Sequence, residues 1–358
     1  MKTITVTTQN AINYGAVLQA YALHRKLTEW GADDRLLNLK RQSRVCFQRL
    51  ALNRDLPFIL YHNLRSLPSF PAVFRRVRRF RAFVRDEIPM TREYENARAV
   101  ADDPPKADVY ITGGDQMFNA FRGVQPAAML RFGAADTKRI SYSTSMGQAA
   151  VADAYVEEYT AALRAYDALS LREEGLRTYI EGLAGFPCRT DLDPSFLLTR
   201  EEWSALAVPP TVRRPYALCY VLLEHPLLQK AADRLRAETG LPLVVLNGGS
   251  RPLLRGDWVV NDAGPREFLG WFMGAKAVLT TSFHGTCFSI LLEKDFWTLA
   301  WARGETRIHA LAKKMGLESR IVTEKLSSIT PVDFAAAQAA IAAGRGEAEE
   351  YLKRELGL

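Results

Sequence analysis

Short apolar strands alternate with amphipathic helices along this chain, in two series that a proline-rich break separates. In the first series, residues 4–7 alternate apolar and hydroxyl side chains, which predicts a strand. A helix over 16–30 and a second strand over 36–39 follow. Because a strand, a helix and another strand in this order form the unit of a parallel sheet, the pattern predicts an α/β fold.

The second series begins beyond 209–215, where Pro209, Pro210 and Pro215 interrupt the pattern. Its predicted elements alternate between strand and helix over 216–223, 226–239, 243–246, 265–275 and 277–281. At 358 residues the chain is long enough for two domains. We therefore expect two doubly wound domains that face a cleft, with ligands at the carboxyl ends of the strands.

The predicted boundaries follow the break and the charge pattern. We expect an N-terminal domain over 1–208 and a C-terminal domain over 209–330. The N-terminal domain contains a basic insertion over about 40–105, which we expect to be helical in parts and to lack strands. A helix over 331–358 should pack back on the N-terminal domain.

Two loops of the first series carry candidate ligand-binding residues. Asn13, Tyr14 and Gly15 lie between the first strand and its helix, where glycine allows close approach and the helix N-terminus favours an anion. An ordinary turn capped by Asn13 is the alternative. Gly114, Asp115 and Gln116 follow the apolar strand 107–112. There Asp115 could take a proton from a sugar hydroxyl, or could cap a helix.

Two further strand ends carry cationic side chains. Arg172 presents a planar fork that suits carboxylate or phosphate, and Glu173 could hold it in place or act as an acid. A solvated Arg–Glu pair is the alternative. His284 follows Ser282 and precedes Gly285 at a predicted helix N-terminus, where it can bind phosphate or move a proton. A core histidine is the other interpretation.

A later loop holds Arg303 and Arg307, which could meet an anion or form an exposed basic loop.

The cysteines are scattered without a zinc or disulfide spacing, so we expect them to be reduced. No apolar run of 18 residues occurs, and the first residues lack the apolar core of a signal peptide, so we expect a cytoplasmic protein.

The basic excess of the chain is local. The net charge is +7, yet residues 40–86 hold 12 Lys or Arg against 2 Asp or Glu, a net +10 that leaves −3 elsewhere. Within this segment, 75–85 forms a cationic amphipathic pattern. It predicts docking of an acceptor or an anionic membrane surface by Arg75, Arg76, Arg78 and Arg79. Nucleic acid and an apolar side packed on the domain are the alternatives.

Seven stretches, taken together and in order, resemble the polysaccharide pyruvyl transferase family. They are NYGAVLQAYAL (13–23), TGGDQMFN (112–119), SYSTSMG (141–147), SLREEG (170–175), DLDPSFLL (191–198), PREFLGWFMGAKAVLTTSFHG (265–285) and the loop through Arg307. The resemblance spans about residues 4–320. It implies a glycosyltransferase-B-like fold of two Rossmann-like domains with the active site between them.

The resemblance also implies the chemistry. The family moves the enolpyruvyl group of phosphoenolpyruvate onto a sugar, usually as a pyruvate ketal on two hydroxyls, and the resemblance assigns phosphoenolpyruvate binding to Arg172 and His284. Many members carry Gly-Asp where this chain has Gly15 and Ala16. The missing carboxylate shifts the predicted base to Asp115, and we expect neither a cofactor nor a metal.

The predicted function is therefore a pyruvyltransferase that acts on a sugar of a cell-surface polysaccharide or its lipid-linked precursor, without nucleic acid as a partner. A nucleotide-sugar glycosyltransferase of the same fold is one alternative, because fold does not determine function. A non-catalytic protein that binds membrane or nucleic acid is another, and it depends on 75–85 alone.

Overall fold

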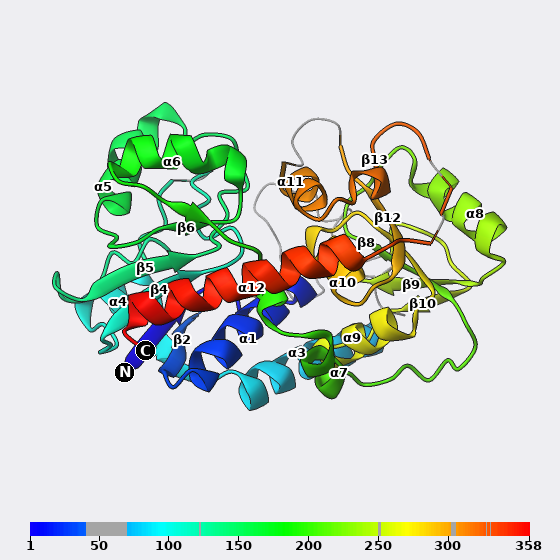
Figure 1. Cartoon of the computed structure of the whole chain (residues 1–358). Helices are drawn as coiled ribbons and strands as arrows, with labels where there is room; N and C mark the ends of the chain where they lie inside the picture. The colour runs from blue at the N-terminus through cyan, green and yellow to red at the C-terminus, as the bar shows by residue number, and fades with distance from the viewer. Residues whose placement is uncertain (41–69, 122, 250–251, 302–305, 327, 330) are drawn as a thin grey trace, which may run out of the picture.

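The computed structural model describes residues 1–40, 70–121, 123–249, 252–301, 306–326, 328–329 and 331–358. These residues form two lobes, each built on a parallel β-sheet with helices on both faces (Figure 1). The predicted α/β class with two sheet domains is confirmed.

The N-terminal sheet has the strand order β3-β2-β1-β4-β5, and all its pairs are parallel. Its strands are β1 (Lys2–Val6), β2 (Asp33–Leu39), β3 (Met90–Tyr94), β4 (Val109–Gly113) and β5 (Lys138–Tyr142). A short parallel pair, β6 (Ser170–Leu171) and β7 (Arg189–Thr190), extends the lobe beyond β5. The expectation that 40–105 lacks strands is wrong, because β3 adds to the exposed edge of β2.

Helices lie on both faces of this sheet. The helices before the proline-rich break are α1 (Tyr14–Glu29), α3 (Phe70–Glu87), α4 (Ala97–Asp102), α5 (Val156–Leu163), α6 (Arg177–Ala184) and α7 (Arg200–Leu206). Successive side chains of β4 point to opposite faces, so that Ile111 packs with α1 and Tyr110 packs with α4 and α5. Asn13 caps the N-terminus of α1, where its side chain accepts a hydrogen bond from the Ala16 amide.

The C-terminal sheet has the order β10-β9-β8-β11-β12-β13 and is also parallel. Its strands are β8 (Ala217–Val221), β9 (Leu243–Asn247), β10 (Trp258–Val260), β11 (Ala277–Thr280), β12 (Asp295–Leu299) and β13 (Ile321–Val322). Its helices are α8 (Leu228–Thr239), α9 (Pro265–Gly274), α10 (Phe283–Leu291) and α11 (Thr306–Lys314). The chain thus continues the βα alternation beyond the proline-rich break.

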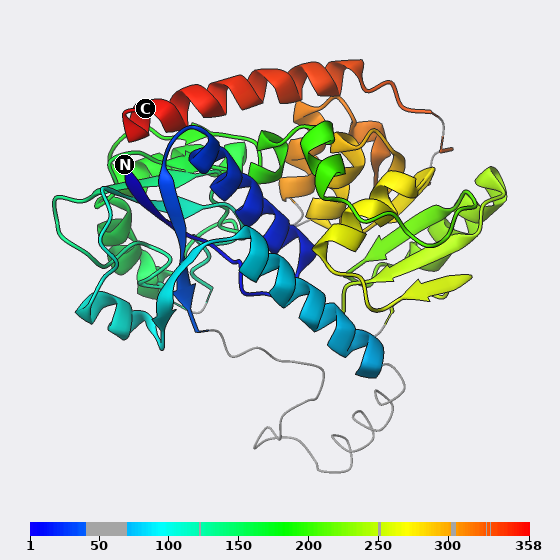
Figure 2. The same cartoon turned by 90° about the horizontal axis from the view of Figure 1, so that it is seen from below.

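The last helix, α12 (Ala335–Leu356), runs along both lobes (Figures 1 and 2). Near its start, Gln338 donates to the carbonyl of Ile290 in α10. Near its end, the Tyr351 hydroxyl donates to the carbonyl of Ser141 in β5, at 2.9 Å. α12 therefore forms hydrogen bonds with both lobes. No helix of the described residues is long and apolar enough to cross a membrane.

The two lobes share one hydrophobic core. Tyr14, at the start of α1, stacks on Phe268 of α9 with ring centroids 4.7 Å apart. Its hydroxyl donates to the carbonyl of Ala263 at 2.9 Å, and its side chain is 1% exposed. Tyr14 therefore joins the lobes, and its ring lies in the core, where it cannot contact a ligand in the cleft.

α3 also crosses from one lobe to the other (Figure 2). Its Arg76 donates to the carbonyls of Asn247 and Gly249, while Arg75 and Arg79 contact the side chain of Asp262. The prediction that Arg76 docks an acceptor or a membrane is thus corrected, because Arg76 is buried against the C-terminal lobe, whereas Arg75 and Arg79 contact that lobe and stay 53% and 40% exposed. Within the described residues, Arg78 makes no such contact.

We predict that Tyr14→Phe lowers the free energy of unfolding by about 1–3 kcal/mol, because the buried carbonyl of Ala263 loses its donor. Urea denaturation measures this. The control is Tyr21→Phe on the same helix, since the Tyr21 hydroxyl has no hydrogen bond to the described residues. It should change stability by less than about 0.5 kcal/mol. Equal losses in the two variants would contradict the bridging role of Tyr14.

Candidate active site

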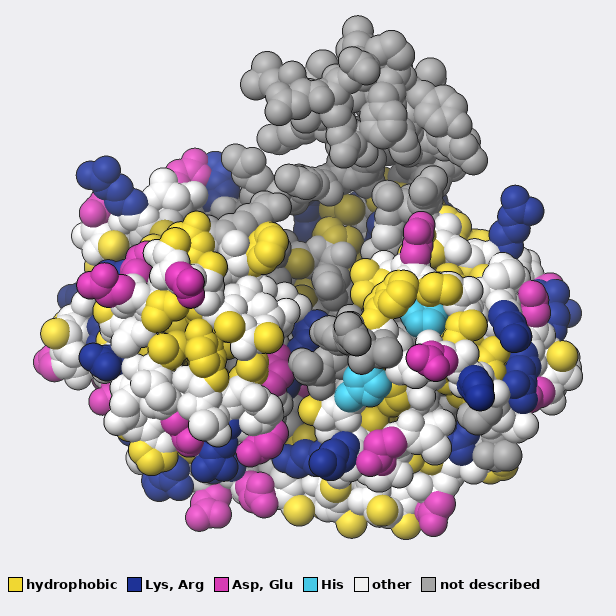
Figure 3. Space-filling model, turned by 90° about the horizontal axis from the view of Figure 1, so that it is seen from above, with side chains coloured by type: hydrophobic (Ala, Val, Ile, Leu, Met, Phe, Trp, Pro, Cys, Tyr) yellow, Lys and Arg dark blue, Asp and Glu magenta, His cyan; other side chains and the backbone are white. Residues whose placement is uncertain are grey.

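The predicted site residues come from strand ends of both lobes. β1 leads into α1, β4 leads into 114–116, β6 leads into Arg172, and β11 leads into α10. Because carboxyl ends of parallel strands share one edge of a sheet, these loops gather where the two sheets face each other. The face shown in Figure 3 is hollowed between the lobes, and Lys, Arg and His side chains lie along the hollow.

Arg172, Asp193 and His284 form the buried centre of this site. Nη2 of Arg172 lies 2.8 Å from Oδ2 of Asp193, and Nε2 of His284 lies 3.5 Å from the same oxygen. The Asp193 side chain has no exposed surface. Burial opposes its ionisation, yet Arg172 and then His284 outweigh burial, and the pKa of Asp193 lies below its usual range. One carboxylate thus joins a cation of the N-terminal lobe to a histidine of the C-terminal lobe.

The guanidinium of Arg172 has unused donors. Although Nη2 is close to Asp193, none of the three nitrogens is aligned for a hydrogen bond with a described residue, and the side chain is 3% exposed. Arg139 provides the contrast, because its buried guanidinium donates to carbonyls of Leu130, Phe132 and Thr137. Buried polar groups are normally paired. The donors of Arg172 are therefore available for a ligand.

Two helix N-termini meet at His284, the second residue of α10. Gly15, the second residue of α1, lies so close that a Cβ on it would sit 2.1 Å from Cγ of the His284 ring. Gly15 therefore permits the contact between the two helices. Both helices direct the positive end of their dipoles toward this space, which favours an anion.

Two carboxylates lie beside Arg172. Glu173 is 3% exposed; its Oε1 accepts a hydrogen bond from the Ser145 hydroxyl, and its Oε2 has no partner among the described residues. Asp115 follows the turn after β4 with φ of 44°, and its carbonyl accepts from the Ser145 amide. It does not cap a helix. Burial lowers the pKa of Arg172, but Asp193 and then Asp115 and Glu173 outweigh this effect and raise it.

A second cation completes the site from α11. With the amide oxygen of Gln116 turned toward it, Arg307 donates to that oxygen from Nη1 and Nη2, both at 3.0 Å. The Arg307 guanidinium lies 5.5 Å from the ring centre of Phe283, and that of Arg172 lies 5.0 Å from the same ring centre. Phe283 thus keeps two arginines at set positions by cation–π contact.

Other predicted residues shape the loops. Asn13 caps α1, and Ser282 caps α10 by accepting from the Gly285 amide. Gly285 leaves no room for a Cβ, which would lie 2.2 Å from Oγ1 of Thr280. Gly114 has φ of 47° and lies against Gln19, so a side chain would be both strained and crowded. These four residues set the backbone around the site.

Sequence reasoning missed Asp193, Phe283 and Ser145. Asp193 lies in the matched stretch 191–198 and directly precedes a proline, which was the available signal. Arg303 and Cys46 lie outside the described residues. Cys188, Cys219 and Cys287 are free thiols and buried.

We predict that Asp193→Asn lowers the free energy of unfolding by about 3–5 kcal/mol near neutral pH, because Arg172 stays buried without its counter-charge. The depressed pKa of Asp193 stabilises the fold above the unfolded pKa of about 3.9, and this stabilisation is lost as the pH falls toward the folded value. Urea denaturation from neutral to acid pH should show that the wild type has a higher free energy of unfolding than Asp193→Asn near neutral pH, and that this difference is lost below about pH 4.

Glu158→Gln is the control for this prediction. Glu158 pairs with Arg131 at 2.7 Å, and both side chains are more than 40% exposed. An exposed pair of this kind contributes about 0–1 kcal/mol. A similar small effect at Asp193 would contradict its central place.

Comparison with known proteins places the sequence in a family and the structure in a fold. The sequence matches the family described as polysaccharide pyruvyl transferase over residues 13–303, and no curated protein matches it. UDP-GlcNAc 2-epimerase from Neisseria meningitidis, solved bound to UDP-GlcNAc, has 10% identity and a TM-score of 0.50, over 99% of this chain and 99% of the epimerase. UDP-GlcNAc 2-epimerase from Methanocaldococcus jannaschii has 11% identity and a TM-score of 0.48, over 100% of this chain and 99% of that one.

At such low identity, the likeness to the Neisseria enzyme shows the fold alone. The expected glycosyltransferase-B-like fold, with two Rossmann-like domains, is confirmed. The family match covers most of the sequence, so this chain is a transferase that belongs to the polysaccharide pyruvyl transferase family.

Proposed function

We propose that this protein transfers the enolpyruvyl group of phosphoenolpyruvate to a sugar and forms a pyruvate ketal. The observation that supports this most directly is the buried Arg172, whose guanidinium nitrogens lack hydrogen bonds within the described part of the chain, beside His284 at two converging helix N-termini. Such a site suits a small ligand with more than one anionic group. Phosphoenolpyruvate carries a carboxylate and a phosphate.

The hydrogen-bonding groups Arg172, His284 and Arg307 divide between the two anionic groups of phosphoenolpyruvate. Arg172 can bind the carboxylate through its free Nε and Nη1, because a guanidinium matches a carboxylate with two parallel hydrogen bonds. His284 lies at the N-terminus of α10 and Arg307 at the start of α11, so both can contact the phosphate. Phe283 and Asp193 position these groups.

The reaction is a substitution at C2 of the donor. A proton is added to the methylene carbon, and C2 becomes an oxocarbenium-like electrophile. A sugar hydroxyl forms a bond to C2 and gives its proton to a base. The bond between C2 and the phosphate oxygen then breaks, and inorganic phosphate leaves. A second hydroxyl of the sugar then adds to C2 and closes the ketal. The released phosphate accepts the proton of this second hydroxyl.

This reaction needs an acid and a base, and two carboxyl groups flank Arg172. We assign the acid to Glu173, because its Oε2 has no partner among the described residues while Ser145 holds Oε1. We assign the base to Asp115, because it follows β4 at the edge of the site and is partly exposed, where a sugar hydroxyl can reach it. Ala16 supplies no carboxylate in this chain.

The acceptor that we propose is a sugar of a cell-surface polysaccharide or its lipid-linked precursor. We place the reaction in the cytoplasm, where phosphoenolpyruvate is made. Peripheral contact with the inner face of the membrane stays a prediction. Four arginines of α3 were predicted to make this membrane contact. Within the described chain, Arg78 is the one of the four that makes no contact with the C-terminal lobe.

We expect calorimetry to show phosphoenolpyruvate binding, and Arg172→Lys to weaken it roughly 10-fold to 100-fold, because an ammonium cannot form two parallel hydrogen bonds with a carboxylate. Arg164→Lys is the control, since Arg164 is exposed and donates to the carbonyl of Leu183. Incubation with the donor and a glycan panel should release phosphate and add the mass of pyruvate.

A thermal-shift comparison with UDP-GlcNAc separates this proposal from a nucleotide-sugar glycosyltransferase. Stabilisation by UDP-GlcNAc without stabilisation by phosphoenolpyruvate would refute the proposed donor.

We also expect Asp115→Asn to lower kcat by about 100-fold or more while the affinity for phosphoenolpyruvate stays unchanged, because the base acts on the acceptor hydroxyl. Asn tolerates the left-handed backbone of this position, so the loop should keep its shape. Asp136→Asn, an exposed carboxylate in the loop before β5, is the matched control. A loss of donor affinity equal to the loss of kcat would assign Asp115 to donor binding.

A further inference from the structure

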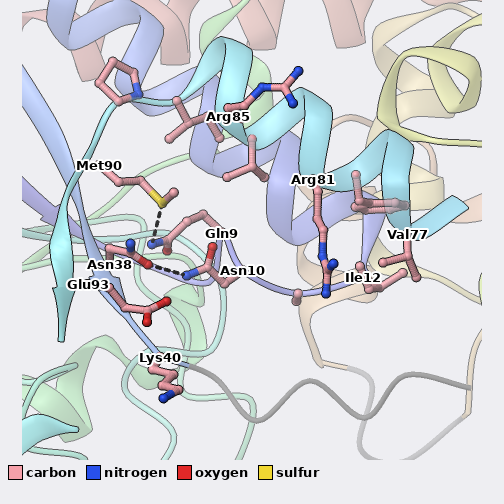
Figure 4. A pocket seen from close by; sticks show the side chains of 15 residues that line it. Gln9, Asn10, Ile12, Asn38, Lys40, Val77, Arg81, Arg85, Met90 and Glu93 are labelled. Atoms are coloured by element: carbon pink, nitrogen blue, oxygen red, sulfur yellow. Dashed lines mark hydrogen bonds between the residues drawn. The ribbon is translucent and has the colours of Figure 1, made fainter. Parts of the chain in front are cut away.

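A pocket of about 440 Å³ lies between α3 and the ends of β1 and β2 (Figure 4). Pockets that take small molecules have about 300–1,000 Å³. One wall is apolar and comes from α3 and the residues after it, including Val77, Phe80, Val84 and Ile88. We call this cavity the α3 pocket.

The opposite wall of the α3 pocket is polar and fixed. The Gln9 amide donates to the carbonyl of Leu37 at 2.7 Å, and the Asn10 amide donates to Oδ1 of Asn38 at 3.1 Å. These bonds leave the oxygens of Gln9 and Asn10 and the amide nitrogen of Asn38 without a partner in the described chain. The Glu93 carboxylate also lines the pocket without an ion pair there. A sugar has hydroxyls that donate and accept hydrogen bonds, and it also has an apolar C–H face. The polar wall and the apolar wall of the α3 pocket therefore suit a sugar.

Arg81 adds a positive charge to the α3 pocket. In Figure 4 its side chain extends from α3 toward the segment with Asn10 and Ile12, whereas Arg85 points away. Arg85 pairs with Asp86, and Lys40 pairs with Glu95. Arg81 has no ion pair within the residues that the structure describes. A free guanidinium at a sugar-sized pocket favours a ligand that carries an acidic group.

A second pocket, of about 320 Å³, adjoins the α3 pocket. Gln9, Asn10 and Lys40 line both pockets, so this segment is their common wall. The second pocket is also lined by Gln116, which contacts Arg307 in the active site. The two pockets thus lie next to each other at the carboxyl ends of the N-terminal strands, and Gln116 lies between the second pocket and the candidate active site.

We propose that these two pockets bind the acceptor as an acidic oligosaccharide, with its acidic group at Arg81 and the sugar that receives pyruvate near Asp115. This inference rests on the proposed function, and it names the class of acceptor. A lipid chain does not fit the α3 pocket, because the amides and the carboxylate of one wall would lose water without gaining partners.

The test is binding of the full-length protein, without phosphoenolpyruvate, to an array of oligosaccharides of one to six sugars. Its arms are neutral glycans and glycans with a uronate, a phosphate or a sulfate, which distinguish the sources of the acidic group. We expect binding to acidic glycans of two or more sugars. Arg81→Gln should weaken it about 10-fold or more, the loss expected for a charge-assisted hydrogen bond.

Arg78→Gln is the matched control, because Arg78 is an exposed arginine of the same helix that does not line the α3 pocket. It should leave glycan binding unchanged. Equal binding of neutral and acidic glycans, equal loss in the two variants, or no binding to any glycan by the folded protein would overturn the inference. Because the array contains no donor, glycan binding that follows the prediction would stand even if phosphate release fails.

Discussion

The buried carboxylate of Asp193 is the interaction on which the site depends. It removes a charge from water, which costs free energy unless partners are close and well placed. Its partners are Arg172 of one lobe and His284 of the other, at 2.8 and 3.5 Å. A shift of one lobe against the other would separate His284 from this carboxylate, while Arg172, which belongs to the same lobe as Asp193, would stay beside it. The contact with His284 therefore requires one arrangement of the lobes at the site.

The contacts between the lobes meet this requirement. Tyr14 fills the shared core and hydrogen-bonds across it, and α12 holds both sheets. The arginines of α3 donate to carbonyls at the end of β9 and contact Asp262. Because Gly15 lies directly against the His284 ring, the position of α1 also sets the position of the histidine. The same packing that stabilises the fold thus places Arg172 and His284 at the donor site.

Much of this could be predicted from the sequence, because βα alternation is local and the ends of parallel strands share an edge. That reasoning placed Arg172, His284 and Asp115 on loops that the structure brings together. Contacts between distant residues could not be predicted. Asp193 was not singled out, since its role depends on a histidine 91 positions away. β3 was missed because its residues are mostly polar, and only pairing with β2 makes them a strand.

The basic segment shows why net charge is a weak guide to a binding site. A helix with six arginines favours docking on an anionic surface when it is considered alone, but three of those arginines neutralise or cap groups of the C-terminal lobe. Arg76 is buried, whereas Arg75 and Arg79 stay 53% and 40% exposed and are paired with Asp262 and Glu267. Recognition of a ligand by α3 therefore depends on where its arginine side chains lie rather than on how many arginines it has. Arg78 and Arg81 both line a further pocket formed by arginines of α3, but Arg81 alone of the two also lines the α3 pocket with its fixed amides, and this makes Arg81 the candidate ligand-binding residue.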